Sequence, residues 1–337
     1  MNKTIYTTAI PQTILHILPA IALIFAVISC EKDIEFNGSE SSPKPVLNAF
    51  LSSGETVGIR LTESRFFLYP AVDEPFKPIT DATVHLRNEA GQTIPLAHTG
   101  NGYYSTDYRP ASNTRLNILA TFPTGMADIE STTDIPAPPL LLPTHDSLSI
   151  LIDTFIYNFS TIPAQINFKC ENMNLSFIDP VQTTDYYRLL LTLRRTNSNG
   201  TITHSNIQFG SSDIVFGTKE DEILEETDKN RYKVFSDEII NGKEHTINLH
   251  WNYMTLLAES DSFGSSTYDL IVELQHITKD CYLYFKSLGA AQNPGDFGNL
   301  ISEPVQVYTN VTNGIGIFAA YTSTKNTYRI ASPEGKD

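Results

Sequence analysis

Short segments in which apolar and polar residues alternate fill the chain from Pro45 to Ile135. Such a period of two is typical of half-buried β-strands, because successive side chains of a strand point to opposite faces. Asn101-Gly102, which precedes Tyr103-Tyr104, is typical of a tight hairpin turn. No helical period competes, and the pattern predicts a β-sandwich of about seven strands. The clearest expected strands are residues 46–51, 57–61, 82–87, 93–96, 116–122 and 127–135.

The chain after residue 143 is also predicted to be β-rich, with one or two short helices. Asp280–Ala291 is the best helix candidate, because Cys281, Tyr284, Phe285 and Leu288 follow the i, i+3, i+4, i+7 pattern. Asn241-Gly242 indicates another hairpin turn. The expected strands of this part are residues 148–157, 166–170, 185–193, 246–251, 268–274, 304–308 and 316–321.

Four prolines fall within residues 135–143. Proline cannot donate to a β-ladder, so this segment favours an extended, stiff linker over a central strand. We therefore place a domain boundary here. The predicted organisation is a signal segment at residues 1–29, a tether at 30–44, a β-sandwich at 45–135, a linker at 136–143 and a second β-rich domain at 144–337.

The first thirty residues predict a destination outside the cytoplasm. One charge, Lys3, precedes the apolar run Ile14–Ile28, which is followed by Ser29 and Cys30, as in a secretory signal. The run has about fifteen residues, fewer than the roughly 20 that a spanning helix needs. There are two alternatives. The segment is an uncleaved membrane anchor, or it is a signal in which Cys30 has no special role.

Val27-Ile28-Ser29-Cys30 resembles the lipobox of bacterial lipoproteins. The resemblance implies that the Cys30 thiol is lipidated and that Cys30 becomes the N-terminus after cleavage. The acidic residues Glu31, Asp33 and Glu35 resemble the export tag of surface lipoproteins in Bacteroidota. The alternative for these acidic residues is an ordinary hydrophilic tether.

Charge and cysteine content narrow the classes of function. The formal net charge is −15, which repels phosphate backbones and argues against nucleic-acid binding. The chain has three cysteines, so Cys170 and Cys281 remain if Cys30 carries lipid. They form either one disulfide, worth on the order of 4 kcal/mol for so long a loop, or two separate buried thiols.

Two segments of the N-terminal part carry a family resemblance. Pro78-Ile79-Thr80-Asp81-Ala82-Thr83-Val84 and Gly100-Asn101-Gly102-Tyr103-Tyr104 resemble strand starts of the carboxypeptidase-regulatory-like, transthyretin-like sandwich. That resemblance implies a rigid spacer or interaction module rather than a catalytic domain.

The second part resembles a more specific family. Its segments Asp185–Leu189, Tyr282–Leu288, Glu303–Asn310 and Asn313–Phe318 occur in order. With the lipobox, they resemble an uncharacterised lipoprotein family of Bacteroidota, number 4249 among the domains of unknown function. Members of that family resemble accessory lipoproteins of TonB-dependent outer-membrane transporters, which implies a location and a partner but no reaction.

No motif predicts a reaction, a cofactor or a metal site. His245 and His250 have an odd spacing, which puts strand residues on opposite faces. The acidic stretch at residues 219–230 lacks EF-hand spacing, so we interpret it as solvated surface. The paired tyrosines Tyr103-Tyr104 and Tyr186-Tyr187, with Tyr282 and Tyr284, either line a glycan or peptide face or divide between core and surface.

We therefore hypothesise a non-enzymatic, lipid-anchored protein of the outer-membrane surface that serves a TonB-dependent transporter. Two alternatives stay open. One is a surface hydrolase whose site is assembled from distant residues, which a deep pocket with carboxylates or a His–Asp pair would favour. The other is a structural adhesin or spacer, which predicts neither a pocket nor a transporter partner.

Overall fold

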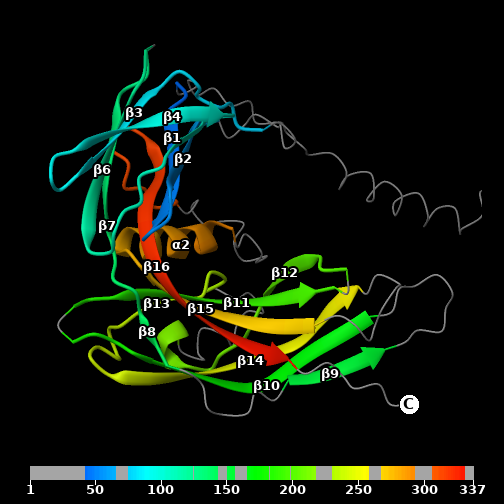
Figure 1. Cartoon of the computed structure of the whole chain (residues 1–337). Coiled ribbons are helices and arrows are strands. Elements are labelled where there is room, and N and C mark those ends of the chain that lie inside the picture. The colour runs from blue at the N-terminus through cyan, green and yellow to red at the C-terminus, as the bar shows by residue number, and fades with distance from the viewer. Residues whose placement is uncertain are drawn as a thin grey trace, which may run out of the picture. The chain divides into compact units, whose positions relative to one another are not determined.

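The structure of the protein is a computed structural model (Figure 1). It describes residues 42–65, 75–123, 125–142, 150–155, 165–181, 183–197, 199–217, 230–257, 267–292 and 306–330. The predicted signal segment with Cys30, the acidic tag and residues 219–229 of the acidic stretch lie outside these ranges. Within them, no helix is both long and apolar enough to cross a membrane.

The alternating pattern of the N-terminal part forms the seven predicted strands. At the turn between β4 and β5, Asn101 and Gly102 both have positive φ, 50° and 75°, which is the backbone of a two-residue hairpin turn. The strands are β1 (Pro45–Ser52), β2 (Val57–Glu63), β3 (Thr83–Asn88), β4 (Thr93–Gly100), β5 (Tyr103–Thr106), β6 (Thr114–Thr121) and β7 (Ile129–Ile135).

The second part consists of further strands and one described α-helix, which confirms the prediction of a mainly β fold with a short helix. Thr278 caps the helix by accepting a hydrogen bond from the backbone of Cys281. The elements are β8 (Leu140–Leu141), β9 (Ile150–Phe155), β10 (Gln165–Ile178), β11 (Tyr186–Thr196), β12 (Ile202–Ile207), η1 (Ile214–Phe216), β13 (Val234–Ser236), β14 (Glu244–Leu257), β15 (Thr267–Ile277), α2 (Lys279–Ala291) and β16 (Ile315–Ile330).

Twelve described strands form one continuous sheet in the order β12-β11-β15-β16-β1-β2-β5-β4-β3-β6-β7, with β13 also paired to β11. A second sheet has the order β14-β10-β8, with β9 on β10. Buried side chains from β10, β11, β14 and β15 form the core between the two sheets. A separate core fills the N-terminal sandwich.

Strand β16 joins the two parts of the chain. Its first half pairs in parallel with β1, from Val46–Ile315 to Ser52–Tyr321, and its second half pairs antiparallel with β15. Phe318 and Ala320 belong to the N-terminal core. Figure 1 shows this strand in red, running from β1 to the side of β15. The predicted domain boundary stays a prediction, but the two parts share a strand as well as a linker.

The Pro-rich segment is bound along β16 rather than exposed as a free linker. Thr322 donates a hydrogen bond to the carbonyl oxygen of Pro136 (2.7 Å), and Thr324 donates to that of Pro139 (2.6 Å). Side chains at alternate positions of one strand thus satisfy carbonyls of a segment whose prolines have no N–H to offer. Leu140–Leu141 also pairs with the end of β10, as the edge strand β8 of the second sheet.

The strand predicted at residues 304–308 is wrong for its described part, because residues 306–310 have no strand structure. The reason is local competition for the backbone. The N–H of Tyr308 donates to the hydroxyl of Ser287 on α2 (2.8 Å), and the Tyr308 hydroxyl donates to Asp280 at the start of α2 (2.5 Å). The helix therefore takes the Tyr308 N–H that a β-ladder would use, and the bond to Asp280 holds the Tyr308 side chain on the helix.

Candidate functional site

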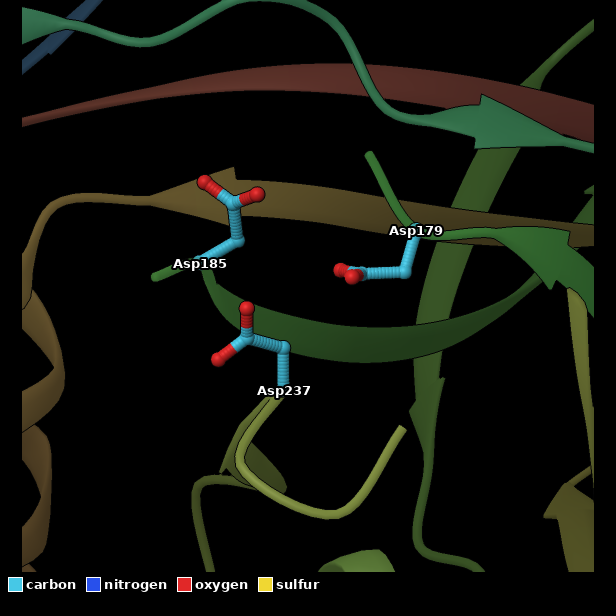
Figure 2. A group of neighbouring side chains, drawn as sticks. All are labelled: Asp179, Asp185 and Asp237. Carbon is cyan, nitrogen blue, oxygen red and sulfur yellow. The ribbon is translucent and has the colours of Figure 1, made fainter. Parts of the chain in front are cut away.

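Three buried aspartates lie close together in the described structure. Asp179 follows β10, Asp185 precedes β11, and Asp237 follows β13. Their exposed fractions are 1%, 5% and 1%. One carboxylate oxygen from each lies within 4.8 Å of those of the other two. Figure 2 shows how the three stretches of chain bring these side chains together.

Protein donors already bind the oxygens of Asp179 and Asp185. The Tyr187 hydroxyl donates to Asp179 Oδ1 (2.6 Å), and the Gly242 N–H donates to Asp179 Oδ2 (2.7 Å). Thr183 donates to Asp185 Oδ2 (2.6 Å), and His276 Nε2 lies 3.0 Å from Asp185 Oδ1. These bonds connect the 179–185 turn to β11, β15 and the 240–243 turn.

Asp237 is bound differently from the other two. Asn241 donates from Nδ2 to Asp237 Oδ2 (3.0 Å), and the Asp237 N–H donates to the carbonyl oxygen of Asp185 (3.0 Å). Burial raises the pKa of Asp237, and the charges of Asp179 and Asp185 raise it further. Asp237 therefore takes up a proton more readily than an ordinary aspartate as the pH falls.

The pKa of Asp185 shifts the other way. Burial by itself raises the pKa, but the hydrogen bonds from His276 and Thr183 outweigh burial and leave the pKa of Asp185 below its usual value. Burial, together with the hydrogen bond to Asp179, raises the pKa of Tyr187, so its phenol stays a hydrogen-bond donor. The surroundings of Asp185 thus favour its charged form, whereas those of Asp237 disfavour its charged form.

The three aspartates could in principle bind a metal ion. Calcium takes oxygen ligands at about 2.3–2.6 Å, so three oxygens within 4.8 Å can reach one ion. The hydrogen bonds that Asp179 and Asp185 accept from Tyr187, Gly242 and Thr183 argue against it, because they already satisfy oxygens of these buried carboxylates. The residues fit an internal hydrogen-bond network better than a metal centre.

The sequence analysis did not identify these three aspartates. Each stands at a strand end beside a turn, in Phe177-Ile178-Asp179-Pro180, in Asp185-Tyr186 and in Ser236-Asp237-Glu238. An Asp next to a turn is common, since its side chain binds nearby backbone groups. The signal that distinguishes these three is their contact in space, which strand periodicity does not contain.

Two histidines pair with carboxylates in the described structure. His245 Nε2 lies 3.1 Å from both oxygens of Asp213, and His276 contacts Asp185. His250, the neighbour considered with His245, is exposed, and its backbone pairs with Gly210. A hydrolytic triad also needs a nucleophile hydrogen-bonded to the base. Among the described residues, no Ser or Thr hydroxyl and no thiol has a hydrogen bond to the His245 or His276 ring.

Cys281 is a free cysteine in the first turn of α2, and it is completely buried. Burial raises the pKa of its thiol to about 12, an effect that Arg188 partly offsets. The backbone of Cys170 lies in β10, but its side chain is outside the described part. The structure thus fits the interpretation of Cys281 as a buried thiol, and its pairing with Cys170 stays a prediction.

The paired tyrosines divide between core and surface. Tyr104 and Tyr187 are each 1% exposed, whereas Tyr103 is 48% exposed. Tyr186 packs against Tyr282 of α2, with 4.9 Å between the ring centroids and the rings tilted by 35°. The rings that remain partly accessible surround α2 and cover a small buried cluster, so packing explains most of them.

The segment Asn313–Phe318 has a structural role that explains its sequence. Asn310 binds both backbone groups of Phe318, accepting from its N–H (3.0 Å) and donating to its carbonyl (2.8 Å). Gly316 has φ +106°, and a Cβ there would lie 2.0 Å from the carbonyl oxygen of Leu47. Only glycine allows β16 to approach β1 this closely.

Comparisons with known proteins give one family and no activity. Among solved structures, a two-domain fibronectin type-III segment of chicken tenascin has 9% identity, covering 70% of this chain and 91% of that one. Its TM-score of 0.19 is too low to support an argument. No curated protein matches. The model of a domain of unknown function, DUF4249, matches residues 31–327. Because this match covers most of the chain, the protein belongs to the DUF4249 family.

Proposed function

We propose that the protein is a non-enzymatic, lipid-anchored protein of the outer-membrane surface that docks onto a TonB-dependent nutrient transporter. The observation that carries the proposal is the position of Cys30. It follows an apolar run and a small residue, as in a lipobox, and the family match begins at the next residue, 31. A chain tethered there presents the rest of the protein outside the cytoplasm.

The fold supports a docking role because it keeps its surface in a fixed geometry. Strand β16 pairs with β1 and with β15, so that the strands of the two parts of the chain form one continuous sheet. Thr322 and Thr324 tie the Pro-rich segment to the same strand. A surface held by a continuous sheet loses little conformational entropy when it binds, which favours its use as an interface.

Two experiments test this function. A Cys30→Ala variant is expected to lose incorporation of an alkyne-labelled fatty acid and to leave the membrane fraction. Cys281→Ala is the matched control, since Cys281 is a buried thiol. Continued fatty-acid labelling of Cys30→Ala would disprove the anchor.

The second experiment concerns the partner. The tagged protein, extracted from its own outer membrane in a mild detergent, is expected to bring down a β-barrel transporter in stoichiometric amount. Recovery of the protein alone at several salt concentrations contradicts the docking role. That result favours a structural spacer, for which the continuous sheet through β1 and β16 is the supporting observation.

A further inference from the structure

The edge of β11 is shared by two strands that leave a gap between them. β13 pairs with Tyr186–Arg188, and β12 pairs with Leu191–Thr196. Between these two ladders, the Leu189 N–H donates to the Lys233 carbonyl oxygen (3.1 Å), so residue 190 is the position of β11 that lies between the two edge strands. A pocket of about 190 Å³ lies at this gap.

The lining of this pocket is cationic. Arg188, Arg231 and Lys233 contribute to it, together with the amides Asn206 and Gln208, and among the described residues no Asp or Glu lines it. This composition stands out on a chain with a net charge of −15. Three cations around one concave site produce a local positive field that attracts anions.

Among the described residues, Arg188 is held in place by aromatic rings and a backbone carbonyl rather than by a carboxylate. Its guanidinium carbon lies 4.3 Å from the ring centroid of Phe285 and 6.0 Å from that of Tyr232. Its Nε donates to the carbonyl oxygen of Tyr232 (3.2 Å). Among the described residues it forms no ion pair.

The electrostatics of Arg188 agree with this geometry. Burial lowers the pKa of Arg188, and Cys281 and Glu273 only partly offset that effect. Arginine nevertheless stays charged in proteins. A partly buried guanidinium without an ion-pair partner is costly, and an anion in the pocket would reduce that cost.

The turn before β13 holds the backbone of the other two cationic residues, Arg231 and Lys233, in place. The buried Asn230 side chain binds both backbone groups of Val234, at 2.8 and 3.0 Å, and the backbone carbonyl oxygen of Asn230 accepts from the Lys233 N–H at 2.8 Å. Lys233 Nζ lies 5.3 Å from the ring centroid of Phe209. Arg231 is exposed at the same turn. The backbone positions of the cations are therefore set before any ligand arrives.

From this arrangement we infer that the pocket between β12 and β13 binds a small organic carboxylate. A guanidinium fork matches a carboxylate with two parallel hydrogen bonds. Leu190 and Phe209 add apolar lining beside the cations, which suits a ligand with an apolar body. The volume is below the roughly 300–1,000 Å³ of drug-sized sites, so the ligand has few heavy atoms. This inference is independent of the lipid anchor.

The test uses the full chain in a non-ionic detergent and two probes of nearly equal shape, benzoate and its neutral amide, benzamide. Ligand-observed NMR titration measures both affinities. Benzoate is expected to bind saturably and at least about tenfold more tightly than benzamide, because a charged acceptor strengthens the hydrogen bonds from the guanidinium groups. Binding should weaken as the salt concentration rises.

Variants locate the site. Arg231→Gln changes an exposed residue and should fold normally, and it is expected to weaken benzoate about threefold or more. Arg188→Lys keeps the charge but loses the fork, and should weaken benzoate about tenfold. Arg87→Gln, an exposed arginine on β3, is the control and should bind like the parent.

Several results would overturn the inference. These are equal affinity for benzoate and benzamide, no saturable binding of benzoate, or benzoate binding that Arg231→Gln leaves unchanged. Inorganic phosphate serves as a third probe. If phosphate binds in an Arg231-dependent manner and benzoate does not, the organic carboxylate is the wrong ligand class.

Discussion

His276 and Asp185 form a buried pair in which the second nitrogen of the ring is also occupied. His276 Nε2 lies 3.0 Å from Asp185 Oδ1, and His276 Nδ1 lies 2.9 Å from the carbonyl oxygen of Ala137. A carbonyl oxygen can only accept, so Nδ1 carries a hydrogen. The pair therefore connects β15 to the start of β11 and to the Pro-rich segment.

Replacing His276 should destabilise the fold. His276→Gln leaves Asp185 as a buried carboxylate with a poorer partner, and removing one member of a buried pair costs about 3–5 kcal/mol. We expect a loss toward the lower end of that range, because Thr183 still donates to Asp185. Chemical denaturation of the purified protein measures the change.

The control for that variant is His204→Gln, which changes an exposed histidine on β12. It should alter the free energy of unfolding by less than about 0.5 kcal/mol. Equal stability of the His276 and His204 variants would contradict the importance of the His276–Asp185 contact.

Asp185 and Asp237 have pKa values shifted in opposite directions, so removing the charge of each should change the stability of the fold in opposite directions. The folded pKa of Asp185 is lowered, so its contribution to stability is present above its unfolded pKa and disappears as the pH falls through the folded pKa. The folded pKa of Asp237 is raised, so its contribution is present at low pH and disappears as the pH rises through the folded value.

Asp185→Asn should therefore be destabilised at neutral pH by about 1–3 kcal/mol, with the difference from the parent shrinking in acid. Asp237→Asn keeps an oxygen for Asn241 and removes a repelled charge, so it should be as stable as the parent or more stable at neutral pH. Denaturation curves across the acid range measure both. A large loss for Asp237→Asn that calcium-binding measurements trace to a lost ion would show that the cluster is a cation site.

The sequence was sufficient to predict those strands and helices whose pattern of apolar residues lies within a single segment. Strands β1 to β7 follow from alternation within each segment, and α2 follows from the spacing of Cys281 and Phe285. Each of these patterns buries one face of a single element, so it can be recognised without knowing the neighbouring elements.

The features that depend on distant contacts could not be predicted in the same way. The parallel pairing of β1 with β16 joins Val46 to Ile315, and alternation does not say which strands are neighbours. The three aspartates and the cationic pocket likewise come from separate turns. The failed strand at residues 306–308 shows the same limit, because Ser287 and Asp280 of α2 decide the outcome there.

Gly316 should tolerate no side chain. A Cβ at this position would lie 2.0 Å from the Leu47 carbonyl oxygen at φ +106°, so Gly316→Ala must separate β16 from β1. We expect a loss of about 3 kcal/mol or more, or insoluble protein, because backbone strain adds to lost pairing. Gly58→Ala on β2 is the matched control, since nothing lies within 4 Å of the added Cβ. Similar melting temperatures for the two variants would refute the close approach.

Native Cys281 should resist alkylation. Its thiol is 0% exposed and burial raises its pKa to about 12, so little thiolate forms at neutral pH and reagents cannot reach it. Iodoacetamide should modify Cys281 only after denaturation, as peptide mass spectrometry can show. The same experiment without reductant tests the pairing. If Cys170 and Cys281 are both alkylated after denaturation, they are separate thiols, and if neither is alkylated until a reductant is added, they form the disulfide. Rapid modification of the folded protein would contradict the burial of Cys281.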